Sequence, residues 1–362
     1  LLVEREHEIE AFAGSSQFKV TAIFAAGKQE LKAELKQRFD SEDAARDFLE
    51  SLAGAAFTVT DISTSPSSRN PAAPFTTSTL QQEANSKLGM GSRATMASAQ
   101  KLYQEGRITY MRTDSVNLSS QAIAASADYI KRLYGIEYSH VRKFKTKSAG
   151  AQEAHEAIRP TDITRESVSG SDYDQRLYDL IRRRTLASQM APAKLENTTI
   201  TISINDGEKQ NNSSKTNDKL VFEAKGQVVL FDGFLRVYGG GKDDTILPTV
   251  KSGDQLQRHS VEARQVFARP PARYTEGTLV KKLEELGIGR PSTYATIMNT
   301  IQTRGYAEKG DSEGIPRDVI LLQLIDNKVE REIIQEKTGS NKGKLVPTPA
   351  GELISGFLTD HF

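Results

Sequence analysis

A tyrosine and an arginine stand two residues apart in the polar segment 106–115, at Tyr110 and Arg112. If this segment is extended, the two side chains point to the same side, because side chains in a strand alternate between faces. A phenol attacks a phosphodiester only after losing its proton, which requires a base or a nearby cation. A guanidinium neutralises phosphate oxygens and stabilises the charge that builds on them. The pair therefore predicts attack on a phosphodiester, although a tyrosine that only packs is the commoner case on composition alone.

A second polar group, His155, Glu156 and Arg159, lies in the segment 152–162. On a helix, His155 and Arg159 would share a face at a spacing of four residues and could hold a phosphate between two cations. The spacing does not match a zinc protease, because His-Glu-x-x-Arg lacks the second histidine of that motif. A solvated helix end before Pro160 explains the same residues equally well, so both interpretations remain open.

A third segment, 286–294, places Arg290 just before Ser292, which is expected to cap a helix. Backbone N–H groups at a helix N-terminus bind anions, so this segment suits a DNA phosphate. With the helix that precedes it, the segment forms a helix-turn-helix pattern. An ordinary capped helix has the same pattern. The segment 74–83 offers hydroxyls and amides and is interpreted as a hinge followed by a helix start.

The composition of the 362 residues limits the kinds of site that the chain can contain. There is no Cys, which excludes thiol nucleophiles, disulfides and Cys-ligated metal centres. No apolar run approaches the roughly 20 residues that cross a bilayer, so no membrane association is expected. The net charge is only +1, so a nucleic-acid site requires a local concentration of positive charge. Residues 101–160 meet this condition, with ten Lys or Arg against six Asp or Glu.

The spacing of apolar residues predicts the elements that hold these segments. Strands are expected at 18–24, 57–62, 200–204, 220–224, 227–231 and 235–238, and helices at 4–12, 41–52, 84–102, 119–135, 177–190, 279–286, 292–305 and 348–362. The Ser- and Pro-rich stretch 63–74 is interpreted as a linker. We therefore predict a multidomain α+β protein. Its β domain (1–83 and 195–268) is interrupted by a helical domain (84–194), and a helical, winged-helix-like domain (269–362) follows and packs against residues 1–12.

Four of these segments resemble, in sequence and order, the motifs of bacterial type IA DNA topoisomerases of the topoisomerase I branch. They are residues 74–83, 108–115, 153–162 and 283–294, followed by 301–306, so the resemblance covers nearly the whole chain. It implies that Tyr110 attacks one DNA strand and forms a 5′-phosphotyrosyl link. It also implies that Arg112 positions the scissile phosphate and that His155 supports the site. Further DNA contacts are implied for Thr113, Asp114, Glu156, Arg159, Arg290, Ser292, Thr293 and Tyr294.

The same resemblance implies how the protein acts as a whole. The helical domain would swing on the β domain as a gate, and a second strand would pass through the gap. The energy of the broken bond would be kept in the phosphotyrosine, so negative supercoils would relax without ATP. The expected partners are single-stranded and negatively supercoiled DNA. The protein is expected to be a monomer in the bacterial cytoplasm, at the nucleoid.

One departure from the family concerns the metal. Type IA enzymes hold a catalytic Mg²⁺ in an N-terminal Toprim domain, on a Glu and an Asp-x-Asp-x-Asp cluster. Here Asp172 and Asp174 have the spacing of a pair but lack a third Asp and a strand context. The Toprim lysine and the Cys-rich zinc ribbons are not found either. We therefore expect a piece of a longer enzyme that binds no metal itself, needs the Toprim domain as a partner, and alone binds single-stranded DNA but cleaves it poorly.

Two other classes of protein share some of these features. A non-catalytic single-stranded DNA-binding module would use Tyr110 as a stacking surface for bases. A winged-helix regulator would need a specific double-stranded site and would leave Tyr110 and His155 without a role. A covalent protein–DNA adduct separates the enzyme from both alternatives.

Overall fold

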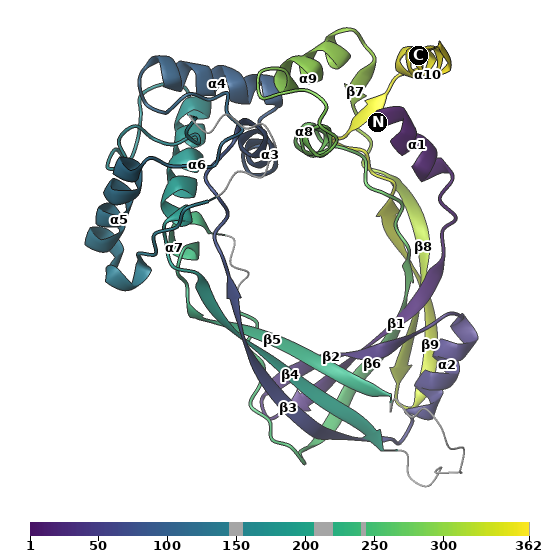
Figure 1. Cartoon of the computed structure of the whole chain (residues 1–362). Helices are drawn as coiled ribbons and strands as arrows, with labels where there is room; N and C mark the ends of the chain where they lie inside the picture. Colours follow the sequence, from purple (N-terminus) through teal and green to yellow (C-terminus); the bar gives the residue numbers. More distant parts are fainter. Residues whose placement is uncertain (145–154, 206–219, 240–243, 362) are drawn as a thin grey trace.

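The computed structural model describes residues 1–144, 155–205, 220–239 and 244–361. The chain closes into a ring (Figure 1), in which an antiparallel sheet and two lobes follow one another. The helical lobe contains the described residues between 73 and 192, together with 232–238. The closing lobe contains residues 1–12, 272–309 and 345–361. None of the described helices is both long and apolar enough to cross a membrane.

The sheet draws its strands from both sides of the helical lobe in sequence. They are β1 (Ser16–Ala26), β2 (Gln29–Phe39), β3 (Ala56–Arg69), β4 (Ala193–Asn205), β5 (Val221–Phe231), β6 (Gln255–Phe267), β8 (Ile315–Ile325) and β9 (Lys328–Thr338). Their order is β1-β2-β5-β4-β3-β6-β8-β9, and β1 also pairs with β6, so six strands close on themselves. The strands β3 and β4 lead into and out of the helical lobe, and they pair from Ala56 opposite Asn205 to Arg69 opposite Ala193.

Aromatic side chains from three strands meet in the core of the sheet. Phe24, Phe57 and Phe222 are fully buried, and the ring of Phe24 lies 5.0 Å from that of Phe57 and 5.7 Å from that of Phe222. Helix α2 (Glu42–Ser51) packs against this core, and Ser41 caps its N-terminus through its side chain. The prediction of a helix at 41–52 is confirmed.

The helical lobe consists of six helical elements. They are α3 (Thr77–Leu88), α4 (Ser92–Gln104), α5 (Ser120–Tyr134), the 3-10 helix η1 (Ile136–Tyr138), α6 (Asp172–Ser188) and α7 (Leu235–Tyr238). Side-chain caps fix where three of them begin, because Thr76, Ser119 and Ser171 each accept a backbone N–H of the following turn. Phe75 and Tyr178 are among the side chains that fill the core between these helices.

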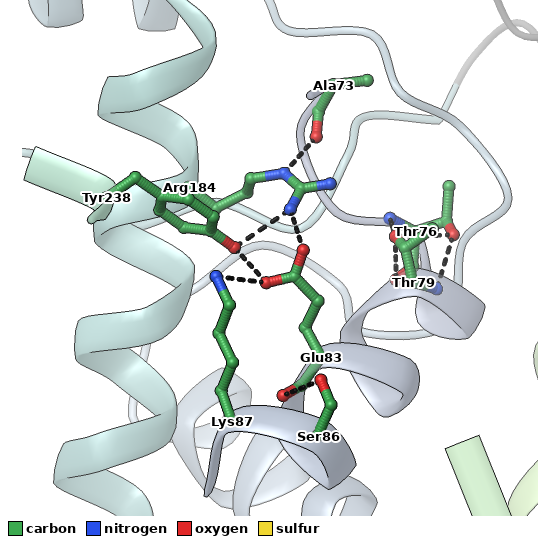
Figure 2. Close-up of polar contacts among 8 residues, drawn as sticks. All are labelled: Ala73, Thr76, Thr79, Glu83, Ser86, Lys87, Arg184 and Tyr238. Carbon is green, nitrogen blue, oxygen red and sulfur yellow. Dashed lines mark hydrogen bonds and ion pairs between the residues drawn. The ribbon is translucent and has the colours of Figure 1, made fainter. Parts of the chain in front are cut away.

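A partly buried charge network holds α3, α6 and α7 of the helical lobe together, close to the end of β5, from which the chain enters α7 (Figure 2). The guanidinium of Arg184, on α6, contacts the carboxylate of Glu83 and donates to the hydroxyl of Tyr238 at 2.9 Å and to the carbonyl of Ala73 at 2.6 Å. The ammonium of Lys87 lies 3.0 Å from the same carboxylate. Burial would raise the pKa of Glu83, but the bond from Tyr238 and the charge of Arg184 outweigh it and lower the pKa. We call Glu83, Lys87, Arg184 and Tyr238 the arm junction.

The closing lobe is built around its own small core. Its elements are α1 (Leu2–Glu10), α8 (Glu276–Glu285), α9 (Tyr294–Thr303), β7 (Ala307–Lys309), β10 (Leu345–Pro347) and α10 (Pro349–His361). The core includes Tyr274, Leu283 and Tyr294, and Leu1 and Leu2 of the N-terminal segment pack against it. The first and last parts of the chain therefore share one lobe.

Polar contacts join the closing lobe to the helical lobe, where α8 lies beside α3 and α9 beside α4 (Figure 1). The carboxylate of Glu276 is 6% exposed, accepts the N–H of Ser92 at 2.6 Å and lies 2.8 Å from the ammonium of Lys309. The hydroxyl of Ser78 donates to Glu284 at 2.7 Å. We call these five residues the closing junction, because they complete the ring.

Part of the predicted linker 63–74 is a strand. Residues 63–69 continue β3, and Pro66 lies opposite Glu196 of β4. A proline is tolerated there because β6 pairs with β3 only at Phe57 and Thr58, which leaves the other edge of β3 without a partner strand in the described residues. The Ser and Pro content had suggested a linker, but the ladder with β4 determines the conformation.

Two further predictions about local structure are wrong. The expected helix 84–102 is two helices, because Gly89 has a φ of +68° and ends α3 in the left-handed conformation. The expected domain boundary at residues 83 and 84 consequently falls inside α3. Residues 235–238 are helical rather than extended, since the chain turns at Gly233 (φ +50°) and the side chain of Tyr238 then reaches the arm junction.

The prediction of a helical domain at 269–362 is wrong for residues 315–338. These form β8 and β9, a hairpin that extends the sheet by pairing with β6. The turn between them uses Asp326 (φ +47°) and Asn327 (φ +66°), two residue types that tolerate this conformation in tight hairpins. An Asp-Asn pair directly after the apolar run at the end of β8 was the signal for this hairpin.

Candidate functional site at the junction of the lobes

The segment with Tyr110 and Arg112 is not a strand of a sheet, and its backbone bends at Thr109, Met111 and Arg112. Ile108 forms an isolated antiparallel bridge with Pro160. Met111 and Thr113 are buried, whereas Tyr110 is 43% exposed and Arg112 is also exposed. The predicted alternation is therefore present, and it leaves both the phenol and the guanidinium accessible.

Helix α3 anchors the buried residues of this segment. The hydroxyl of Thr77 donates to the carbonyl of Met111 at 2.7 Å, and the N–H of Thr113 donates to the same hydroxyl at 2.8 Å. The N–H of Thr77 donates to the carbonyl of Thr113 at 2.9 Å. These bonds fix the backbone on both sides of Arg112. Thr113 is buried in this arrangement, so its side chain is not accessible for the DNA contact that was predicted for it.

The ring of Tyr110 has an aromatic neighbour on α4. Its centroid lies 5.3 Å from that of Tyr103, at an interplanar angle of 69°, and Tyr103 is 42% exposed. The edge-to-face arrangement is a favourable one for aromatic rings. Sequence reasoning missed Tyr103, because six residues separate it from Tyr110 and it lies outside every motif that was considered.

The prediction that His155 and Arg159 share a helix face is wrong. The described part of this motif, residues 155–162, is extended and pairs with its neighbours: the N–H of Thr109 donates to the carbonyl of Arg159 at 2.9 Å, and its hydroxyl donates to that of Ala157 at 2.7 Å. A helix would have needed these carbonyls for itself. Residues 153 and 154 lie outside the described residues. His155 is exposed, on the segment that runs beside Thr109.

Glu156 and Arg159 bind each other. Their side chains lie 2.7 Å apart, and Glu156 also accepts the N–H of Ser119 at 2.6 Å, where α5 begins. Burial would raise the pKa of Glu156, but the bonds from Arg159 and Ser119 outweigh it and lower the pKa. This pair fixes the start of α5, and its contact with DNA stays a prediction.

The residues predicted on α9 have different environments. Arg290 is exposed, and its guanidinium donates to the carbonyl of Gly289 at 2.7 Å. Thr293, rather than Ser292, occupies the N-cap position of α9, and its hydroxyl accepts the N–H of Arg290 at 2.8 Å. Tyr294 is 5% exposed and packs in the core of the closing lobe, so it offers no surface to DNA in this conformation.

The Tyr110 segment and α9 face each other across the closing junction. Burial raises the pKa of Tyr294, and the negative charges of Glu284 and, more weakly, Asp114 raise it further. Arg112 and three residues of α9 also line one cavity. The site is thus composite, with the nucleophile candidate on one lobe and part of its surroundings on the other.

Comparison with known proteins identifies the family. The family model described as DNA topoisomerase matches residues 1–338, and the chain belongs to that family. Its relatives place it in the bacterial type IA branch, as the sequence motifs predicted. It is 40% identical to DNA topoisomerase 1 of Zymomonas mobilis, over 95% of this chain and 30% of that protein. It is 42% identical to DNA topoisomerase 1 of Vibrio cholerae, over 100% of this chain and 42% of that protein.

The fold is similar to a solved structure as well. Full-length topoisomerase I from Thermotoga maritima superposes with a TM-score of 0.73 at 30% identity, over 99% of this chain and 54% of that one. This likeness agrees with a mixed α/β architecture and a large antiparallel sheet. The chain spans roughly a third to a half of the length of these relatives.

Proposed function

We propose that this chain forms the strand-cleaving and gating part of a type IA DNA topoisomerase, with Tyr110 as the nucleophile. The observation that carries the proposal is the exposed pair Tyr110 and Arg112, on a backbone segment fixed by Thr77 beside the closing junction. Rigidly held reactive groups favour catalysis, because the geometry does not have to be organised again at each turnover.

In the proposed reaction, the oxygen of Tyr110 forms a bond to a DNA phosphorus, and the bond from that phosphorus to the 3′ oxygen breaks. The phenol loses a proton and the leaving 3′ oxygen gains one. Arg112 would stabilise the charge on the phosphate oxygens. His155, exposed on the adjacent segment, would support the site. Because one ester replaces another, attack by the 3′-hydroxyl reverses the step and reseals the strand without ATP.

The metal expected for the whole enzyme does not fit the residues described. These contain no group of three or more Asp, Glu or His side chains that could hold a metal ion. No step proposed above therefore depends on a metal held by this part of the chain. We propose that the chain alone binds single-stranded DNA as a monomer and cleaves it poorly. Cleavage would require the Toprim domain as its partner.

A covalent adduct is the decisive observation. The chain is mixed with a Toprim-containing portion of a relative and a single-stranded oligonucleotide labelled at its 3′ end, then denatured and separated by size. The label should migrate with the protein, and Tyr110→Phe should abolish this band. Tyr103→Phe is the matched control, because it removes a hydroxyl from the neighbouring ring and should keep the adduct. An adduct that persists in Tyr110→Phe would eliminate Tyr110 as the nucleophile.

One observation favours a second candidate function, a non-catalytic single-stranded DNA-binding module. Tyr103 and Tyr110 form an exposed pair of rings, and exposed aromatic rings bind unstacked bases. In that case Tyr110→Phe would bind DNA as well as the unmodified chain, no adduct would form under any condition, and Tyr110→Ala would weaken binding.

A further inference from the structure

The cavity beside Arg112 contains two arginines and no acid. It has a volume of about 280 Å³ and lies between α4, residues 111–112 and α9. The helical lobe contributes Arg93, Gln100 and Arg112 to its lining, and α9 contributes Thr296 and Asn299. The remaining lining residues are Met and Ala. The cavity therefore combines two positive charges with neutral groups that form hydrogen bonds.

These two arginines differ from others in the helical lobe. Arg159, Arg176 and Arg183 each lie within 3.3 Å of a carboxylate oxygen. Among the described residues, neither Arg93 nor Arg112 has such an ion pair. The guanidinium of Arg93 makes only a long contact, at 3.5 Å, with the amide oxygen of Asn299 across the junction. Two like charges that share a small cavity repel each other, and an anion between them removes this repulsion.

A phosphate group is the anion that fits this lining. Guanidinium groups bind phosphate through several directed hydrogen bonds, and hydroxyl and amide side chains add neutral donors. The volume is several times the roughly 30 Å³ that one water occupies in the liquid, so a phosphate and its waters can enter. Apolar walls such as Met111 suit the sugar attached to a backbone phosphate.

We propose that this cavity binds a backbone phosphate of the DNA strand next to the one that Tyr110 attacks, with Arg93 as its principal ligand. Because Arg93 belongs to α4 and Thr296 and Asn299 to α9, the bound phosphate joins the two lobes. DNA in the site thus holds the ring closed. The inference deepens the proposed function, since it names a second contact of the same strand.

The salt dependence of binding tests this phosphate contact. Binding of a labelled oligothymidylate is followed by fluorescence anisotropy at several salt concentrations. Arg93→Ala should weaken binding about fivefold at low salt and reduce the slope of log K against log salt by about 0.7, the value for one phosphate on a single strand. Arg93→Lys should restore the slope. Arg176→Ala, which removes an exposed arginine of α6, should leave it unchanged. An unchanged slope in Arg93→Ala overturns the proposal.

A scan of neutral linkages locates the contact on the strand. Oligonucleotides with a single methylphosphonate at each position in turn should bind the unmodified chain more weakly at several positions. Arg93→Ala should lose sensitivity at one of them. If it stays equally sensitive at every position, Arg93 binds no DNA phosphate. If inorganic phosphate binds the unmodified chain but not Arg93→Ala, while the two proteins bind DNA alike, the cavity takes a free anion and the assignment to DNA is wrong.

Closure is measured separately. The chain has no Cys, so spin labels can be placed on cysteines introduced at the exposed positions Lys131 and Lys281. Oligothymidylate should narrow the distance distribution of the unmodified chain but not that of Arg93→Ala. An unchanged distribution would overturn the bridging of the lobes. An absent covalent adduct would overturn the proposed function without altering the salt slope, so the two failures are distinguishable.

Discussion

The helical lobe is held at two junctions that differ in what crosses them. At the arm junction, the charge network (Figure 2) lies beside an apolar core that includes residues of the strands: Ala193 of β4 is buried in this core with Leu186 of α6, and Phe231 of β5 packs against it. At the closing junction, the contacts are hydrogen bonds and ion pairs. Within the described residues, the closing-lobe core has no side chain from the helical lobe, and the reverse also holds.

This difference determines which junction can open. Separating an apolar core costs about 25 cal/mol for each Å² of apolar surface that becomes exposed. Exchanging one hydrogen bond for a bond to water costs roughly 1 kcal/mol. The closing junction can therefore part while both lobes stay folded. The arm junction cannot do so without partial unfolding. This asymmetry supports the proposal that the helical lobe moves as a gate on the strands.

The largest effect is expected at the arm junction. Arg184→Ala leaves the partly buried Glu83 without its main cation and should lower the free energy of unfolding by about 3–5 kcal/mol, measured by chemical denaturation. Arg183→Ala is the matched control, because that neighbour is 52% exposed and, in the described part of the chain, pairs only with Asp179. Its cost should stay below about 1 kcal/mol. Equal losses in both variants would mean that the arm junction contributes no more to stability than an exposed ion pair.

Local features of the sequence predicted the elements that carry the site, but not the contacts that fix it. The helix predicted at 119–135 depends on neighbouring residues and is confirmed as α5, which Ser119 caps. An extended segment around Tyr110 and Arg112 was only a condition in the sequence reasoning, but the alternation that it implied is present, with Tyr110 and Arg112 exposed and Met111 and Thr113 buried. The anchor of this segment, Thr77, lies 36 residues from Thr113 in sequence, and no local pattern reports such a bond.

The main error in the predicted site, the helix expected at His155 and Arg159, also arose from contacts between residues far apart in sequence. Residues 155–159 have the composition of a helix end, but Thr109 takes the carbonyls of Ala157 and Arg159 from about 50 residues away. A contact between segments so far apart overrides a local preference. The closing junction could not be predicted from the sequence either, because Glu276 and Ser92 look like ordinary first residues of two helices.

At the closing junction, Glu276→Ala tests whether polar contacts hold the ring. It removes the acceptor of the Ser92 N–H and the partner of Lys309, which should cost about 1–3 kcal/mol. Hydrogen exchange at the Ser92 amide should accelerate accordingly, with little change at the arm junction. Glu285→Ala, an exposed neighbour on α8, should change neither. Faster exchange throughout the helical lobe would mean that the junction does not open by itself.

Acid pH is expected to open the closing junction, with a smaller effect than Glu276→Ala. Burial would raise the pKa of Glu276, but Lys309 and the Ser92 N–H outweigh it and lower the pKa below its ordinary 4.5. A carboxylate with a lowered pKa stabilises the closed junction above its ordinary pKa and loses that contribution as pH falls through the folded value. Spin labels at positions 131 and 281 should therefore report opening below about pH 4.5. Glu276→Gln should be more open at neutral pH and should respond less to acid; an identical acid response would assign the opening to another group.

The smallest change in the free energy of unfolding is expected from a substitution that should open the closing junction and leave the fold intact. A Cβ on Gly277 would lie 3.1 Å from Cβ of Asn85 and 3.2 Å from Cα of Gln82, so α3 would have to move. Alanine also favours the helical state of α8 by up to about 1 kcal/mol. Gly277→Ala should therefore open the ring, measured by the same labels, with little change in the free energy of unfolding. Gly356→Ala in α10 adds a Cβ that meets nothing and should not open it. If Gly277→Ala instead lowers the free energy of unfolding and leaves the labels in place, the two lobes unfold together, and polar contacts alone do not make the closing junction separable.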